Sequence, residues 1–399
     1  MKQKKILILG ATISQMPLIK EAKEMGFYVI VCTYDPTEPG INVADEYHNV
    51  STTDKEAVLE LAKKKGVDAV ASWASDVAAP PAAYVAESLG LVANPYETVK
   101  MLTDKSAFRN FLKKNGFPFP RHCVYTDQDV QNGFTHSLSY PVIVKPVDSS
   151  GGQGVVQVFK AEELPGAAEL ALSYSGSRKI IVEESIEMIG SQIHGDGFVL
   201  NGELVFSYPG DHIFSGINDL IPVGTSWPSR MPPELLSKAE NEVRKCIKAS
   251  GFQFGPVNIE ARIDKNYNVY IIELAPRIGV NSGSGLIKLG ARVDLAHEMM
   301  KILDGQQIEF EAAKSGCVAY YLLHTETDGV FSEFVIDPEI EKYITGVHMK
   351  VKKGDRMTRY QNMANALGLI HFKFNDQNTM NKTLGQMQNH LFVIAQDKK

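Results

Sequence analysis

Residues 140–159 read YPVIVKPVDSSGGQGVVQVF and place a loop rich in glycine and serine between two apolar strands. The first strand ends near Lys145, and the second begins at Val155. Glycine and serine at 149–154 let backbone N–H groups turn toward an anion, and Lys145 adds a positive charge. The loop has no GK[ST] ending and no helix after it, which excludes a Walker loop. The pattern indicates a phosphate-binding loop of another type, with a plain glycine-rich hairpin as the alternative.

Two carboxylates flank a predicted hairpin turn further along the chain. Strands over 257–263 and 269–274 are joined by DKNYN, with Glu260 on the first and Glu273 on the second. If the strands pair, both acids lie on one face, where they need a cation such as Mg²⁺ on nucleotide phosphates. Arg277 follows in ELAPR and is suited to hold an anion beside the metal. The alternative is two exposed polar positions on strands.

The segment IIVEESI at 180–186 is an apolar strand that ends in two acids. Such a strand can pair its backbone with an adenine edge, while a glutamate accepts from the exocyclic amine. On this segment alone, an ordinary strand end is the favoured interpretation.

The first hundred residues alternate strands and helices, which predicts a parallel sheet built from βαβ units. The carboxyl ends of the strands then share one edge, where open α/β sheets bind ligands. Candidate substrate contacts at this edge are Trp73, Ser75 and Asp76. The alternatives are that Trp73 packs in the core and that Asp76 caps the helix beginning near Val77.

Beyond a proline-punctuated stretch near residue 118, the pattern becomes rich in strands. Asn201-Gly202 predicts a type I′ turn between two of them. The predicted strands span 142–145, 155–159, 180–184, 193–200, 203–208, 257–263, 269–274 and 318–323, and the predicted helices span 103–115, 233–250 and 294–303.

Composition narrows the class of protein. The 399 residues carry 41 Lys and Arg against 47 Asp and Glu, a net charge of −6, and 44% are apolar. These values exclude a disordered chain and disfavour a nucleic-acid partner. The four cysteines lack zinc-ligand spacing, and no apolar run approaches the length of a membrane span. We therefore expect a cytoplasmic protein without a membrane partner.

Taken together and in this order, these segments resemble the ATP-grasp superfamily of ATP-dependent carboxylate–amine and carboxylate–thiol ligases. The likeness also includes GATISQMPLIKEAKEMGFYVIV near the N-terminus and the helix TDKSAFR at 103–109. It implies an α/β and α+β architecture, with a Rossmann-like pre-ATP-grasp domain before a two-lobed ATP-grasp fold. The implied divisions are 1–95 for the first domain, 96–310 for the ATP-grasp domain with a small nucleotide lobe at about 120–190, and 311–399 for a C-terminal β-rich subdomain.

The resemblance also implies roles for particular residues, with ATP and Mg²⁺ (or Mn²⁺) as cofactors. Lys105 and Lys145 would hold the phosphates, and Arg277 would steady the transferred phosphoryl group. The paired acids Glu260 and Glu273 would bind the metal. The hinge beside adenine would comprise Glu183, Glu184 and Ile186, and the lid over the phosphates would comprise Ser150, Gly151, Gly152 and Gly154.

The sequence departs from the family pattern at several positions. Ala275 stands where the family often has an asparagine, and Asn281 is a candidate for the missing polar group. Gln192 stands where a glutamate near the ribose is common, and Glu187 is a candidate substitute. His212 follows an aspartate where many amino-acid ligases have lysine, so it is a candidate active-site cation. A satisfied structural histidine is the alternative for His212.

The stretches LNGELVFSYPGDHIF (200–214) and IPVGTSWPSRMP (221–232) look like the amino-acid and dipeptide ligase branch. This likeness predicts an enzyme that activates a carboxylate as an acyl phosphate and joins it to an amine, releasing ADP and phosphate. Its partners would be small-molecule carboxylate and amine substrates, and the expected assembly is a homodimer. The alternatives are a carboxylating enzyme of the purine-biosynthesis or carbamoyl-phosphate synthase type, and a non-catalytic nucleotide-binding protein. Retention of both lysines, both acids and Arg277 argues against the last.

Overall fold

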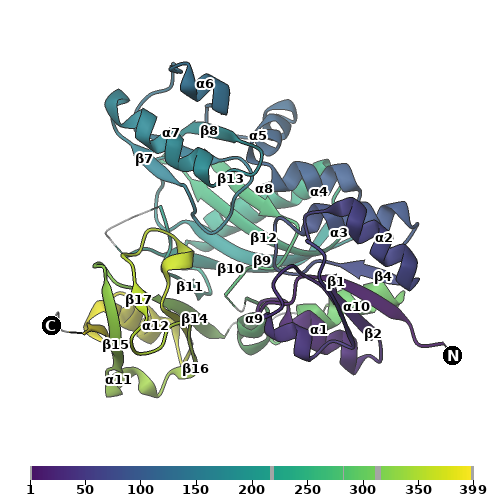
Figure 1. Cartoon of the computed structure of the whole chain (residues 1–399). Coiled ribbons are helices and arrows are strands. Elements are labelled where there is room, and N and C mark those ends of the chain that lie inside the picture. Colours follow the sequence, from purple (N-terminus) through teal and green to yellow (C-terminus); the bar gives the residue numbers. More distant parts are fainter. Residues whose placement is uncertain (1, 216–219, 282, 311–315, 397–399) are drawn as a thin grey trace.

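The computed structural model describes residues 2–215, 220–281, 283–310 and 316–396 (Figure 1). The N-terminal part confirms the predicted alternation of strands and helices. Its four-stranded parallel sheet has the order β3-β2-β1-β4, and the short strand β3 was not predicted. Its strands are β1 (Lys5–Leu9), β2 (Tyr28–Cys32), β3 (Glu46–His48) and β4 (Ala69–Ala71), and its helices are α1 (Met16–Glu24), α2 (Lys55–Lys65) and α3 (Ala79–Ser88).

The helix predicted over 103–115 is confirmed as α5 (Lys105–Lys114), whereas α4 (Tyr96–Thr103), which precedes it, was not predicted. The two helices meet at Asp104. Asp104 has extended backbone, and its Oδ1 accepts from the Ala107 N–H at 2.9 Å, so it caps α5. This cap fixes the direction of α5 and therefore the position of Lys105 at its first turn.

A four-stranded antiparallel sheet of order β5-β8-β6-β7 forms a small lobe, with helices packed on it (Figure 1). Strand β5 and helix α7 were not predicted. The lobe comprises β5 (His122–Thr126), α6 (Asp127–Gln131), β6 (Val142–Pro146), β7 (Val156–Val158), α7 (Leu164–Ser173) and β8 (Lys179–Glu184).

The centre of the molecule is an eight-stranded sheet of order β13-β12-β9-β10-β11-β14-β18-β16. Asn201 (φ 53°) and Gly202 (φ 76°) join β9 to β10 with two positive φ angles, which confirms the predicted type I′ turn. The strands are β9 (Ile193–Leu200), β10 (Glu203–Ile213), β11 (Gly224–Trp227), β12 (Phe254–Ile263), β13 (Val269–Ala275), β14 (Cys317–Leu323), β16 (Ile344–Met349) and β18 (Gly368–Phe374). The helices of this part are α8 (Pro233–Ser250), α9 (Gly283–Ala291) and α10 (Leu295–Asp304).

The last quarter of the chain contributes to this central sheet as well as forming a sheet of its own. Strands β14, β18 and β16 extend the central sheet beyond β11, so hydrogen bonding runs across the predicted division at residue 311. The domain boundaries themselves stay a prediction. The separate sheet has the order β17-β15-β19, and this part comprises β15 (Gly329–Ile336), α11 (Pro338–Glu341), β17 (Arg356–Met357), α12 (Gln377–Leu384) and β19 (Leu391–Ala395). Within the described residues, every helix is too short or too polar to cross a membrane.

Candidate active site

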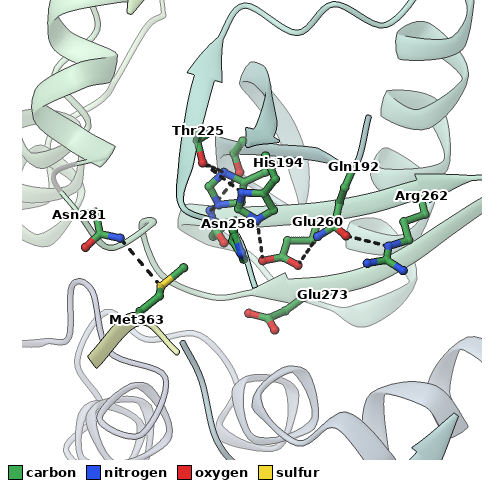
Figure 2. Close-up of polar contacts among 12 residues, drawn as sticks. Gln192, His194, Thr225, Asn258, Glu260, Arg262, Glu273, Asn281 and Met363 are labelled. Carbon is green, nitrogen blue, oxygen red and sulfur yellow. Dashed lines mark hydrogen bonds and ion pairs between the residues drawn. The ribbon is translucent and has the colours of Figure 1, made fainter. Parts of the chain in front are cut away.

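The β12–β13 hairpin places the two predicted metal-binding acids side by side. Glu260 is the register partner of Glu273, and both side chains are 24% exposed. The prediction that both acids lie on one face of a hairpin is therefore confirmed (Figure 2). Two partly buried carboxylates next to each other repel, and a cation bound between them would relieve this repulsion.

A cavity of about 270 Å³ lies between the small lobe and the central sheet, above this hairpin. It brings together most of the residues singled out in the sequence. Those that line it are Asp76, Lys105, Lys145, Ser150, Gly151, Gly152, Glu183, Glu184, Ile186, Gln192, His212, Glu260, Glu273, Arg277 and Asn281. The cavity thus collects a predicted phosphate loop, two lysines and two paired acids in one place.

On the small-lobe side, Lys145 belongs to a buried ion network. Its Nζ lies 2.5 Å from Glu183 Oε2, and Arg109 Nε donates to Glu183 Oε1 at 2.7 Å. Burial lowers the pKa of Lys145 to about 8. Burial alone would raise the pKa of Glu183, but Arg109 and Lys145 hold it at about 2. Lys145 and Glu183 are therefore charged at neutral pH, and Lys145 lines the cavity.

This network changes the interpretation of the hinge segment. The carboxylate of Glu183 is engaged by Arg109 and Lys145 and is almost fully buried, so in this structure it is not free to meet an adenine amine. Glu184 pairs instead with Arg121, whose Nε donates to its Oε2 at 2.8 Å. Ile186 lines the cavity as expected.

The glycine-rich loop approaches both lobes of the cleft. Lys105 Nζ donates to the backbone oxygen of Ser149 at 2.6 Å, which ties the start of α5 to the loop. Gly151 (φ 65°) and Gly152 (φ 74°) adopt left-handed backbone that other residues rarely adopt. The Met363 N–H donates to Gly151 O at 3.1 Å, so the C-terminal part also touches the loop.

Gly154 is one predicted lid residue that does not line the cavity. A Cβ built on it would lie 3.1 Å from the side chains of Pro146 and Tyr174. The structure therefore gives Gly154 a packing role at the end of the loop.

On the sheet side, Glu260 contacts the side chains of Gln192, which precedes β9, and His212 of β10. Gln192 Nε2 donates to its Oε2 at 3.0 Å, and His212 Nε2 lies 3.4 Å from its Oε1 (Figure 2). Arg262 Nε in turn donates to Gln192 Oε1 at 2.7 Å. Burial alone would raise the pKa of Glu260, but the contact with His212 and nearby positive charges hold it well below its usual range. Burial and the neighbouring Glu260 raise the pKa of Glu273.

His212 stacks on a second histidine that the sequence analysis did not single out. The rings of His194 and His212 lie 4.1 Å apart with planes 17° from parallel. A ring nitrogen of each lies close enough to a Glu260 oxygen for a shared metal ion. Stacked rings, however, direct their in-plane lone pairs side by side rather than at one point. His194 Nε2 also lies 3.1 Å from the Asn258 amide nitrogen, and burial lowers the pKa of His194 well below its usual value. We therefore interpret His194 as a neutral support for His212.

Arg277 reaches the N-terminal domain as well as the hairpin. Its Nε and Nη2 donate to the two oxygens of Asp76 at 2.8 and 3.0 Å, and Nη2 lies 3.3 Å from Glu273 Oε1. The interpretation of Asp76 as a helix cap is wrong, because Ala78 precedes α3 and no side chain caps the helix. Asp76 lines the cavity, and its contact with a substrate stays a prediction. Burial alone would lower the pKa of Arg277, but Asp76 and Glu273 raise it, so the guanidinium stays charged.

Three other predicted contacts lie outside the cavity. Trp73 is fully buried in the core, so the prediction that it touches substrate is wrong in this structure, and the core alternative holds. Ser75 Oγ accepts from the Ala78 N–H at 3.3 Å and supports the start of α3 instead. Glu187 is 83% exposed and pairs with Lys265, whereas Gln192 lines the cavity. Which residue contacts the ribose stays a prediction.

Asn281 lines the cavity in left-handed backbone (φ 63°), and its Nδ2 lies 3.9 Å from Met363 Sδ (Figure 2). The sequence analysis did not find Arg109, which is fully buried behind Lys145. A signal was present, because Arg109 follows Lys105 by four residues and therefore shares its face of α5. No local sequence pattern could have predicted that Asp76 pairs with Arg277.

The comparisons with known proteins agree with this geometry. A family model described as an ATP-grasp domain matches residues 138–284. The chain is similar to a formate-dependent phosphoribosylglycinamide formyltransferase from Wolinella succinogenes, at 28% identity over 68% of this chain and 70% of that protein. It is also similar to an N5-carboxyaminoimidazole ribonucleotide synthase from Staphylococcus haemolyticus, at 26% identity over 85% and 87%. Among solved structures, an L-amino acid ligase from Bacillus licheniformis superposes with a TM-score of 0.83 at 20% identity, over all of both chains.

A two-lobed cleft that sets lysines against paired carboxylates is suited to a polyphosphate together with a cation. Residues 138–284 of the chain match the ATP-grasp domain model, so this part of the chain is an ATP-grasp domain.

Proposed function

We propose that the protein is an ATP- and Mg²⁺-dependent ligase that joins a carboxylate to an amine and releases ADP and phosphate. The observation that carries this proposal is the separation of charge across one cavity. Lys105 and Lys145 line the small-lobe side, whereas Glu260 and Glu273 line the sheet side beside Arg277. An anionic polyphosphate would lie next to the lysines, and its cation would lie next to the two glutamates.

The reaction has two steps in this proposal. A carboxylate oxygen attacks the γ-phosphorus, the bond to the bridging oxygen breaks, and ADP leaves with the electron pair. The amine nitrogen then attacks the acyl carbon, phosphate leaves with the pair of the broken C–O bond, and the nitrogen releases a proton. Positioning and charge neutralisation are what such phosphoryl transfer requires of the protein.

Each residue has a task in this scheme. Lys105 and Lys145 bind phosphate oxygens, and Arg277 binds the carboxylate and then the acyl phosphate, oriented by Asp76. Glu260 and Glu273 would hold Mg²⁺, which neutralises charge on the phosphates when bound. The loop over 149–154 covers the phosphates and excludes water, because an acyl phosphate is easily hydrolysed.

The substrates are amino acids in our proposal, since the L-amino acid ligase of Bacillus licheniformis shares the fold over its whole length. A carboxylating synthetase of purine biosynthesis is the second candidate. It is favoured by the similarity to the N5-carboxyaminoimidazole ribonucleotide synthase, which extends over 85% of this chain. A homodimer and a cytoplasmic location stay predictions.

A screen for ADP release tests the proposal. Purified protein is given ATP and Mg²⁺ with pairs of amino acids, with each carboxylate alone, or with bicarbonate and aminoimidazole ribonucleotide, and products are identified by mass spectrometry. Amino-acid ligation requires ADP release that depends on both substrates and a product with a new amide bond. Release only with bicarbonate and the ribonucleotide would establish the second candidate. No ADP release in any arm would contradict both.

A further inference from the structure

A second cavity lies on the other side of two residues that line the first. It has a volume of about 560 Å³ and is formed by the segment before β9, the ends of β10 and β14, Ser226 of β11, and helix α12. Figure 1 shows α12 close to this end of the central sheet. Gln192 and His212 line both cavities, so they form a common wall.

The lining of the second cavity is polar. It includes Ser191, Ser226 and Asn381, together with one cation and one anion, Arg230 and Glu326. The lysines and paired acids of the first cavity do not line it. This chemistry suits a small zwitterion, whose two charges need partners of both signs.

Arg230 is held in place before any ligand arrives. Its Nε lies 3.1 Å from Asp211 Oδ2, and its Nη2 donates to Ser191 Oγ at 3.3 Å. Asp211 is fully buried and also accepts from Ser229 Oγ at 2.5 Å, which fixes the carboxylate. The Arg230 side chain remains 49% exposed, so a preoriented donor is available to an anionic group.

The two residues of the common wall both contact Glu260. Gln192 Nε2 and His212 Nε2 lie 3.0 and 3.4 Å from the two oxygens of Glu260. A molecule in the second cavity is therefore separated only by Gln192 and His212 from an acid that we assign to the metal.

We propose that the second cavity binds the amine substrate, a small amine that carries a carboxylate, and admits it to the acyl phosphate past Gln192 and His212. This inference rests on the proposed ligase function. The glycine-rich loop must cover the first cavity while the acyl phosphate exists, so the amine needs a different opening. Arg230 binds the carboxylate of the amine, and Glu326 pairs with its ammonium group. The ammonium group releases one proton to solvent before the free amine attacks, and the nitrogen releases the second proton as the amide bond forms.

The first test fills the cavity from α12. Asn381→Trp places an indole in the lining, whereas Lys382→Trp places the same indole at the exposed neighbouring position of the helix. Hydroxylamine, which is small enough to bypass the cavity, traps the acyl phosphate as a hydroxamate. We expect Asn381→Trp to lower kcat/KM for the amine about tenfold or more, with hydroxamate formation unchanged. Lys382→Trp should match the wild type. Equal ligation rates in both variants, or a parallel fall in hydroxamate, would overturn the proposal.

A charge variant sharpens this test. Arg230→Gln should raise KM for an amino acid as the amine and leave KM for the corresponding amino-acid amide nearly unchanged, because only the former carries an anion. An equal rise for both amines would count against Arg230 as the carboxylate partner.

A binding measurement separates this proposal from the ligase function. Each of the twenty amino acids is titrated calorimetrically into the wild type and Asn381→Trp, both with a non-hydrolysable ATP analogue. In our proposal an amino acid also binds in the first cavity as the acyl donor, so the number of binding sites decides the test. Loss of one site in Asn381→Trp relative to the wild type supports the second cavity even if no ligation is found. The same number of sites in both proteins, or no binding to the wild type, overturns the cavity assignment whatever the ADP screen shows.

Discussion

Two clusters of buried charge face each other across the first cavity, and they differ in sign. The small-lobe cluster comprises Arg109, Lys145 and Glu183. The hairpin cluster comprises Asp76, Glu260, Glu273 and Arg277. Two cations and one anion give the first a formal charge of +1, and one cation and three anions give the second −2.

The difference shows how one cleft can receive both an anion and a cation. In the small-lobe cluster each oxygen of Glu183 has a cation within 2.7 Å, and the cluster keeps a surplus positive charge. Nη1 and Nη2 of Arg109 are buried without a hydrogen-bond partner among the described residues. In the hairpin cluster, Arg277 is already engaged by Asp76, and the acids keep a surplus negative charge. Each cluster therefore keeps a net charge that a ligand of the opposite sign would neutralise.

The strongest test of this contrast is Glu273→Gln. Loss of one metal-binding carboxylate should lower kcat more than about a hundredfold, because a bound metal contributes several kcal/mol of charge stabilisation. Thermal melting should stay level, since Glu273 is destabilised by its neighbour Glu260. Glu187→Gln, at an exposed position outside the cavity, is the control for a lost acid. Near-normal turnover in Glu273→Gln would exclude it from the metal site.

The next test compares the two clusters by stability. Arg109→Met removes one partner of a fully buried pair and should cost about 3–5 kcal/mol in the free energy of unfolding. Asp76→Asn should cost less, about 1–2 kcal/mol, since Asp76 is partly exposed and Arg277 retains Glu273. Urea denaturation measures the free energy of unfolding of both variants. An equal decrease in both would show that the hairpin cluster does not tolerate the loss of a charged partner better than the small-lobe cluster.

The smallest expected effect is on how the affinity for ATP depends on pH. The pKa of Lys145 is lowered to about 8 by burial, so Lys145 is protonated below this pH and loses its charge above it. Affinity for a non-hydrolysable ATP analogue should therefore decline as pH rises from 7 to 9.5, by up to about tenfold. Lys145→Arg, which stays charged, should flatten the profile. The same decline in both proteins would assign it to another group.

The sequence predicted those features that depend only on residues close together along the chain. The spacing of Glu260 and Glu273 about a short turn predicted their pairing, and Asn201-Gly202 predicted its turn. Strand β5 was missed because its sequence HCVYT is half exposed at the edge of a sheet and shows no clear apolar alternation. Helix α7 was missed because Pro165 and Gly166 obscure its start, although proline is well tolerated in the first turn of a helix.

Contacts between distant segments could not be predicted. Asp76 and Arg277 are 201 residues apart, and their pairing depends on how the N-terminal domain docks on the hairpin. The burial of Trp73 depends on the same docking, since its backbone oxygen accepts from the Ile278 N–H at 3.1 Å. Periodicity and spacing carry no information about such docking, and a resemblance gives only the roles that a family shares.

The continuation of the central sheet from β11 into β14 limits how this chain can vary. Thr225 is the register partner of Tyr320, and its hydroxyl donates to the Tyr320 hydroxyl at 3.2 Å, beside the first cavity. An insertion of one residue before Tyr320 would reverse the faces of β14 and turn this ring away from the cavity. Insertions between α10 and β14 are therefore tolerated only if this register survives. A C-terminal segment exchanged between relatives must bring a strand that fits β11, or the exposed edge will invite aggregation.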